Sequence, residues 1–171
     1  MINNIKTLNQ KIISCQKCPR LVWFREKIAT EKRKSFQNWE YWGKPVPGFG
    51  NLNSQIMILG LAPAAHGANR TGRVFTGDKS ADFLFQSLYE TSLSNIPSSE
   101  NKNDGLILNA YMTVAVKCVP PGDKPSVSEK ANCEVYLNNE LVILDSLKVI
   151  VGLGKIAFDA VLKNIKKNTL S

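Results

Sequence analysis

Four cysteines stand in one close pair and one wide pair along a chain of 171 residues. Cys15 and Cys18 are separated by two residues, whereas Cys118 and Cys133 are separated by fourteen and follow much later in the chain. Thiolate sulfur is a soft donor that binds zinc and iron–sulfur clusters well. The pattern leaves no cysteine over, and it predicts one buried inorganic centre that all four cysteines share.

Other uses of these cysteines stay open at this level. Zinc ribbons pair two short cysteine knuckles, and the second pair here is much wider. A wide second pair fits a four-cysteine [4Fe–4S] site more easily, so the spacing favours a cluster over zinc, though only modestly. Four separate thiols in the core are the plain structural alternative. A disulfide framework is less expected, because the chain is long and poor in cysteine.

Composition places the chain among ordinary globular proteins. Its hydrophobic content is 43%, a usual value, and its length predicts a single domain over residues 1–171. No apolar run approaches the roughly 20 residues that span a membrane, and the polar start of the chain is unlike a signal peptide. We therefore expect a cytoplasmic monomer without a membrane partner, in a compartment where thiols stay reduced.

The chain is basic, with 22 Lys and Arg against 14 Asp and Glu and a formal charge of +8. Such an excess favours a polyanionic partner, with nucleic acid first. The alternative is a lysine-rich surface that only keeps the protein in solution.

Strand-like and helix-like segments alternate along the sequence. Short apolar runs predict strands at residues 55–61, 111–116 and 148–152. Helical spacing predicts helices at residues 5–13, 21–34, 80–90 and 155–167, and a capping box at Ser126–Glu129 opens a further helix that carries Cys133. In the helix at 80–90 we expect Ser80 as the N-cap and the following side chains on the buried face: Phe83, Leu84, Phe85 and Leu88.

This alternation predicts an α/β fold, a three-layer α/β/α sandwich around a mostly parallel sheet. Ligands of such sheets bind beyond the carboxyl ends of the strands. The loop that follows the first strand is rich in small and polar residues over Gly60–Asp78, which lets backbone N–H groups approach a ligand. It is not a P-loop, because no Gly-Lys-Ser/Thr follows. The later Gly152-Leu-Gly-Lys-Ile-Ala157 is interpreted as a packing turn.

Three motifs in this order resemble those of the iron–sulfur uracil-DNA glycosylases. They are Cys15-Gln-Lys-Cys-Pro-Arg-Leu, the Gly60–Asp78 loop, and Val116-Lys-Cys-Val-Pro-Pro-Gly-Asp-Lys-Pro. Within that superfamily, Gly60-Leu-Ala-Pro-Ala-Ala-His-Gly and Gly72-Arg-Val-Phe-Thr-Gly-Asp are similar to family 5 rather than family 4. The resemblance implies a glycosylase fold, a structural [4Fe–4S] cluster on Cys15, Cys18, Cys118 and Cys133, and removal of uracil and other deaminated bases from DNA.

The resemblance also implies roles for residues of the loop. Phe75 matches the aromatic that stacks on a base flipped out of the duplex. Backbone amides around Ala62, Ala64 and Ala65 would bind the base carbonyls and stabilise charge on the leaving base. Asp78 matches the acidic residue that would stabilise the positive sugar or orient water, with a helix cap as the alternative. His66 would contact the base or a phosphate, or would have no catalytic task.

For the DNA backbone we expect a basic face made by Arg20, Arg70, Arg73 and Lys117. Arg70 and Arg73 flank the expected base pocket, where phosphate contacts would anchor the extruded nucleotide. The alternative is that these cations pair with acidic residues and stiffen the loop.

One departure from the family concerns the end of the chain. The family has a C-terminal His-Pro-Ser-type motif, and no histidine follows His66 here. We therefore expect a C-terminally truncated chain, weak or inactive in glycosylase assays. Two other functions stay open, namely a catalytically inactive DNA-binding protein and an iron–sulfur redox protein.

Overall fold

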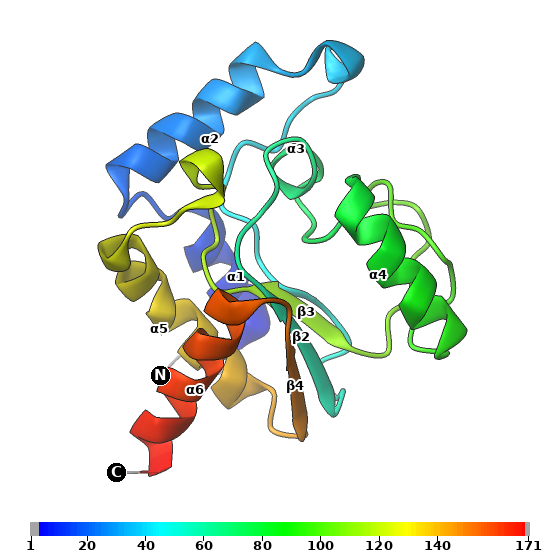
Figure 1. Ribbon diagram of the computed structural model, residues 1–171, viewed down its shortest axis with the longest axis vertical. Coiled ribbons are helices and arrows are strands. Elements are labelled where there is room, and N and C mark those ends of the chain that lie inside the picture. The colour runs from blue at the N-terminus through cyan, green and yellow to red at the C-terminus, as the bar shows by residue number, and fades with distance from the viewer. Residues whose placement is uncertain (1–3, 170–171) are drawn as a thin grey trace.

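The computed structural model describes the backbone of residues 4–169 and the side chains of residues 4–163. Its helices, short 3-10 turns and strands alternate along the chain (Figure 1). In order they are α1 (Ile5–Ile13), α2 (Pro19–Glu31), η1 (Lys34–Phe36), β1 (Phe49–Gly50), β2 (Ile56–Gly60), α3 (Ala68–Thr71), α4 (Lys79–Glu90), β3 (Tyr111–Val114), η2 (Pro121–Asp123), α5 (Val127–Ile143), β4 (Val149–Gly152) and α6 (Lys155–Thr169).

The four described strands form one sheet in the order β1-β3-β2-β4. The β2 strand lies in the middle and pairs in parallel with both β3 and β4, whereas β1 is antiparallel to β3. The sheet is therefore mostly parallel, as the sequence predicts. Because β2 and β3 are parallel, the loops that follow Gly60 and Val114 leave the same edge of the sheet.

Each face of the sheet carries its own apolar core. On one face, Ile58 and Met112 pack with Phe85 of α4. On the other face, Met57 packs with residues of α5 and α6, among them Leu137. Consecutive residues of a strand point to opposite faces, so the change of partner from Met57 to Ile58 shows that helices cover both faces. The α/β/α sandwich is confirmed.

A third apolar cluster closes the molecule beside the cysteines. Leu8 and Ile12 of α1 and Leu21 of α2 pack there against Cys118 and Cys133. The α1 helix is amphipathic, and its two buried residues, Leu8 and Ile12, stand one turn apart on one face. The two N-terminal helices thus form a wall around the cysteine pairs.

The start of α4 differs from the sequence-based prediction. The N-cap is Asp78, whose carboxylate accepts the N–H of Ala81, and Ser80 lies inside the first turn. Phe83 is 80% exposed, whereas Phe85 and Leu88 are buried. A helix turns about 100° per residue, so Phe83 and Phe85 cannot share one buried stripe. The prediction of Ser80 as the cap and Phe83 as buried is wrong, whereas the capping box at Ser126 and Glu129 is confirmed.

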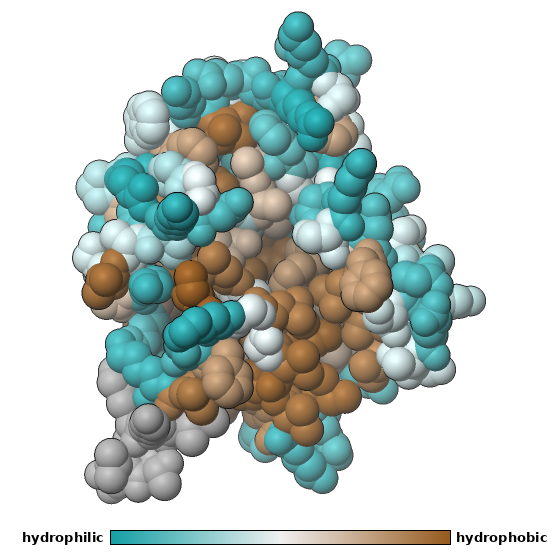
Figure 2. All heavy atoms as spheres, viewed as in Figure 1, coloured by the Kyte–Doolittle hydropathy of each residue, from teal (hydrophilic) through white to brown (hydrophobic). Residues whose placement is uncertain are grey.

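Apolar side chains are exposed where β4 meets α6. Val149 and Val151 of β4 and Phe158 of α6 are each about half exposed, and β4 pairs with β2 alone among the described residues. Figure 2 shows the apolar surface gathered over this part of the sheet. Across residues 4–169, no helix combines the length and apolar character needed to cross a bilayer.

Candidate active-site groove and cysteine centre

The loop between β2 and α4 brings an aromatic ring onto the end of the central strand. A Cβ added at Gly60 would stand 2.5 Å from Cζ of Phe75, so the missing side chain leaves the space that the ring occupies. Phe75 itself has a φ of 52°, which is uncommon for a residue other than glycine. Such strained residues cluster at functional sites. The ring is partly buried and packs against the core on the α4 side of the sheet.

Asp78 has two different surroundings for its two carboxylate oxygens. Oδ1 accepts hydrogen bonds from the backbone N–H of Ala81 at 3.0 Å and from the hydroxyl of Ser80, so Asp78 caps α4. Oδ2 faces Gly67, where an added Cβ would approach it to 2.3 Å. The cap therefore fixes the carboxylate while the other oxygen lies beside the small residues of the loop. The capping geometry is compatible with a chemical role for Oδ2.

His66 is held by a tyrosine outside the loop. Its Nδ1 lies 3.0 Å from the hydroxyl of Tyr41, and the backbone N–H of Arg33 donates to that same hydroxyl. Since the tyrosine oxygen accepts from Arg33, its own proton is available to Nδ1. Burial lowers the pKa of His66, and the charges of Arg33 and Arg70 lower it further. A neutral ring that accepts at Nδ1 carries its proton on Nε2, which is then a donor.

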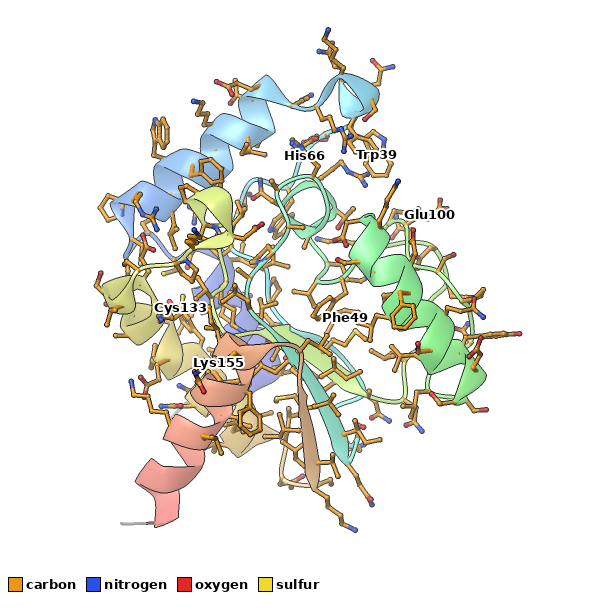
Figure 3. All side chains as sticks on the ribbon, in the orientation of Figure 1. Trp39, Phe49, His66, Glu100, Cys133 and Lys155 are labelled. Carbon is orange, nitrogen blue, oxygen red and sulfur yellow. The ribbon has the colours of Figure 1, made fainter. Side chains whose placement is uncertain are left out.

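An open groove runs past several of the residues that the sequence nominates. It is lined by Ala64, Ala65, His66 and Asp78 of the loop and by Ser99 and Glu100 of the segment between α4 and β3. Figure 3 shows His66 toward α2 and Glu100 toward α4. Ala62 and Phe75 are not among the lining residues. Ala62 packs against the cysteine cluster, and the ring of Phe75 lies deeper at the end of β2.

Two arginines of the loop make their contacts inside the protein. Arg70 donates from Nε to the carbonyl of His66 at 2.7 Å and from Nη2 to that of Gly77 at 2.9 Å. Its guanidinium lies over the rings of Phe36 and Trp39. The two hydrogen bonds link the parts of the loop around His66 and Gly77.

The side chain of Arg73 also makes its contacts inside the protein. It donates to the hydroxyls of Thr76 and Ser99 and pairs with Asp104. Both Arg70 and Arg73 are buried. This geometry fits the loop-stiffening alternative and disagrees with a free phosphate-binding role for either arginine.

Lys117 lies inside the protein, 1% exposed. Its ammonium donates to both carboxylate oxygens of Glu140, at 2.9 and 2.8 Å, and to the hydroxyl of Thr113 at 2.6 Å. A charge that is enclosed and paired in this way does not reach DNA. The expected DNA contact at Lys117 disagrees with the structure, because sequence alone gave no sign of its partner on α5.

Arg20 is the most exposed of the four expected DNA contacts, and it is also paired. It donates from Nε and Nη2 to the carboxylate of Glu129 at 2.8 and 2.7 Å. Two exposed cations that the sequence analysis missed, Arg33 and Lys79, line the groove itself. No periodic pattern marks them, because their place depends on how α2 and α4 approach the loop.

The four cysteines come together at one small cavity, which Arg25 and Tyr136 also line. All four are free thiols, with Cys118 and Cys133 buried and Cys15 and Cys18 partly exposed. Cys133 lies on α5, away from His66 (Figure 3). Within the part of the chain that the structure describes, no three His, Cys, Asp or Glu side chains form a ready-made cage for a metal ion. The finding is a shared cavity rather than closed coordination.

Burial governs the chemistry of the inner cysteine pair. It raises the pKa of the Cys118 thiol, while a hydrogen bond from Arg25 acts in the opposite direction. It raises the pKa of Cys133 to about 12. A buried thiol deprotonates when a metal cation binds it. The donor set therefore suits a soft, positively charged metal centre.

The chain is similar to known proteins over most of its length. The profile of a family described as the uracil DNA glycosylase superfamily matches residues 47–170. A type-5 uracil-DNA glycosylase of Pyrobaculum aerophilum is 45% identical over 93% of this chain and 70% of its own length. A type-5 uracil-DNA glycosylase of Mycobacterium tuberculosis is 46% identical over 94% of this chain and 60% of its own length. A type-4 uracil-DNA glycosylase of Sulfurisphaera tokodaii is only 26% identical.

The fold and the matched residues define a protein of the uracil-DNA glycosylase superfamily. Because the similarity to type-5 members is far higher than to type-4 members, the chain belongs to the type-5 family within it. The resemblance carried by the loop at Gly60–Asp78 is thereby confirmed. The chain spans 60% to 70% of the length of the two type-5 relatives named above.

Proposed function

We propose that this chain is the core of a DNA-repair glycosylase that hydrolyses the N-glycosidic bond of uracil in DNA and leaves an abasic site. The observation that carries the proposal is the groove, where Asp78, His66 and the backbone around Ala64 and Ala65 meet. The family to which the chain belongs agrees with this chemistry.

The extruded base enters the groove that Ala64 and Ala65 line. The ring of Phe75 lies deeper, at the end of β2, so the stacking role that the resemblance implies for it requires the base to reach beyond the groove lining. Positive charge builds on the sugar as the bond breaks, and the Oδ2 side of Asp78 stabilises it or orients the attacking water. The Nε2–H of neutral His66 donates to a base carbonyl or a phosphate. Ala64 and Ala65 are small, so hypoxanthine should be accepted as well as uracil.

DNA is held through exposed cations at the groove rather than through the buried ones. Arg33 and Lys79 line the groove. Arg20 adds positive charge through the part of its side chain that stays exposed beside Glu129. Such contacts neutralise phosphates, so affinity should fall steeply with added salt. We further propose that the protein acts as a monomer inside the cell.

We propose that Cys15, Cys18, Cys118 and Cys133 hold a [4Fe–4S] cluster. Their common cavity, their soft sulfur donors and the buried cation beside Cys118 support this assignment. The cluster would link the N-terminal helices to α5, and this link would stabilise the fold. The groove residues do not depend on it for any chemical step.

The test is release of uracil from a duplex, measured by strand cleavage at the abasic site in alkali. Asp78→Asn keeps the helix cap, because Asn is as good an N-cap as Asp, but removes the charge. It should slow release about a hundredfold without changing DNA affinity. The control is Asp145→Asn, which removes an exposed charge before β4. Undiminished release by Asp78→Asn would place the catalytic role elsewhere.

The same assay separates the alternative functions. Salt-dependent DNA binding without base release by the unaltered chain would support an inactive DNA-binding protein. That outcome would contradict the proposed hydrolysis by this chain. Electron transfer in the absence of DNA, with no release of uracil, would support a redox protein.

A further inference from the structure

Arg25 is a buried cation that no step at the groove uses. It lies on α2 one turn beyond Leu21, and it is 1% exposed. Arginine cannot lose its proton in a protein. Because a buried charge is costly unless it is paired and hydrogen-bonded, this side chain needs an explanation.

The contacts of Arg25 point to the cysteines. Its Nη1 donates to Sγ of Cys118 at 3.3 Å and to the carbonyl of Cys15 at 3.2 Å. One nitrogen thus touches a member of each cysteine pair. The guanidinium also lines the cavity that the four thiols share.

The remaining donors of Arg25 are only partly satisfied. Nη2 stands 3.5 Å from Oε1 of Glu26, a side chain that is 57% exposed. Nε is buried and has no hydrogen-bond partner among the described residues. The side chain therefore keeps one buried donor, Nε, that the described residues leave unmatched, and its charge is paired with a carboxylate that is mostly exposed.

The backbone of Arg25 is fixed from the other side. Nδ2 of Asn69 on α3 donates to the carbonyl of Arg25 at 3.2 Å in a buried position. The backbone N–H of Asn69 in turn donates to the carbonyl of Ala64 in the groove loop. The turn of α2 that carries the guanidinium is therefore held in place by contacts within the protein.

Lys117 does not compete for this role. It directly precedes Cys118, but its ammonium is enclosed by Glu140 and Thr113. Its charge is matched within the protein, whereas that of Arg25 is directed at sulfur.

We propose that Arg25 is a positioning residue for the cysteine centre, one that binds the sulfur ligands and offsets their negative charge. The inference rests on the proposed [4Fe–4S] cluster. Four thiolates around a [4Fe–4S]²⁺ core carry a net charge of −2, and a buried cation beside them stabilises that charge. Hydrogen bonds to ligand sulfur and nearby charge also set the reduction potential of such a cluster.

The experiment compares three variants with the unaltered protein after anaerobic purification. Arg25→Met removes the charge and the donors but keeps an apolar stem. Arg25→Lys keeps the charge but loses the planar fork that reaches Cys118 and Cys15 together. Lys27→Met is the matched control, because it removes an exposed cation from the same helix.

Two quantities are measured, the half-life of the visible cluster absorbance in air and the reduction potential. Arg25→Met should shorten the half-life about tenfold and move the potential to a more negative value. Arg25→Lys should lie between Arg25→Met and the unaltered protein, and Lys27→Met should match the unaltered protein. A purely structural role for Arg25 would not move the potential.

The outcomes are distinct. Equal half-lives and potentials in the unaltered protein and in Arg25→Lys would overturn the inference, and this variant decides the matter if Arg25→Met does not fold. If the unaltered protein contains iron but the Arg25 variants change neither the half-life nor the reduction potential, the inference about Arg25 is wrong and the proposed cluster is unaffected. Absence of iron from the unaltered protein would instead defeat the proposed cluster.

Discussion

The cysteine-bearing end of the molecule and its β4–α6 side differ in which kinds of side chain they bury and which they expose. At the cysteine end, charged side chains lie inside the protein, and Lys117 is paired there with Glu140. At the β4–α6 side, apolar side chains face solvent, with Val149 51% and Phe158 54% exposed. The first region is enclosed by its own contacts. The second stabilises the fold far less per residue, because its apolar surface stays in contact with water.

This difference has a functional meaning. Buried, paired charges cost free energy unless every partner is in place, so the cysteine end is rigid and sensitive to substitution. Exposed valines on an edge strand contribute little, and their replacement should be tolerated. Substitutions in the two regions therefore test whether the fold is more sensitive to changes at the cysteine end than at the β4–α6 side.

The largest effect is expected from Cys118→Ser. Serine is a poor ligand for iron, and Cys118 is one of the two buried cysteines. Because cluster binding contributes folding free energy, the variant should lose its iron and most of its soluble yield. Iron content and yield after anaerobic purification measure both. A folded, iron-loaded Cys118→Ser protein would contradict the assignment.

The second-largest loss of stability is expected from Lys117→Met. It leaves the carboxylate of Glu140 buried without its cation, and breaking a buried pair in this way costs about 3–5 kcal/mol. Chemical denaturation of the anaerobic protein measures the loss. The control Lys27→Met removes an exposed lysine and should change the free energy of unfolding by less than about 0.5 kcal/mol. Similar values for the two variants would show that the Lys117–Glu140 pair does not stabilise this end.

A single matched substitution compares the two regions directly. Val116 beside the cysteines is fully buried, whereas Val151 on β4 is 44% exposed. Val→Thr keeps the shape and adds a hydroxyl, which costs about 1–3 kcal/mol where it is buried without a partner. Val116→Thr should lose that amount and Val151→Thr less than about 0.5 kcal/mol. Equal losses would mean that β4 is covered in solution.

The smallest effect concerns pH. The guanidinium of Arg20, by its hydrogen bond, holds the pKa of Glu129 below its usual value. A lowered carboxylate pKa stabilises the fold above the unfolded value of about 4.3 and loses that effect as pH falls through the folded value. Glu129→Gln keeps the capping box and should melt slightly earlier at pH 7. Its melting temperature should converge with that of the unaltered protein as pH falls below the lowered folded pKa of Glu129, and a constant gap would contradict this origin.

Sequence patterns predicted the framework of this protein well. The three apolar runs became β2, β3 and β4 because short β-branched segments bounded by polar turns have few other stable uses. The capping box at Ser126 also appears as predicted, because it depends on residues four positions apart at most. The loop after β2 lines a groove, as expected for a loop at the carboxyl ends of parallel strands, and its role as the active site stays a prediction.

Side-chain partners were not predictable in the same way. Lys117 and Glu140 are separated by 23 residues, and only the packing of α5 on β3 brings them together. Tyr41 and His66 meet because α2 and the loop after it fold over the groove. Charge in the sequence indicated a basic protein, but which cations face solvent depends on these long-range contacts.

Metal analysis of the anaerobically purified protein tests the central claim most directly, because the proposed role of the enclosed end depends on its four cysteines. The account predicts about four iron and four inorganic sulfide per chain, as a [4Fe–4S] cluster requires. It also predicts loss of both in Cys118→Ser. One zinc ion per chain without sulfide would contradict the cluster, and a folded protein without metal would show that the cysteines are only part of the core.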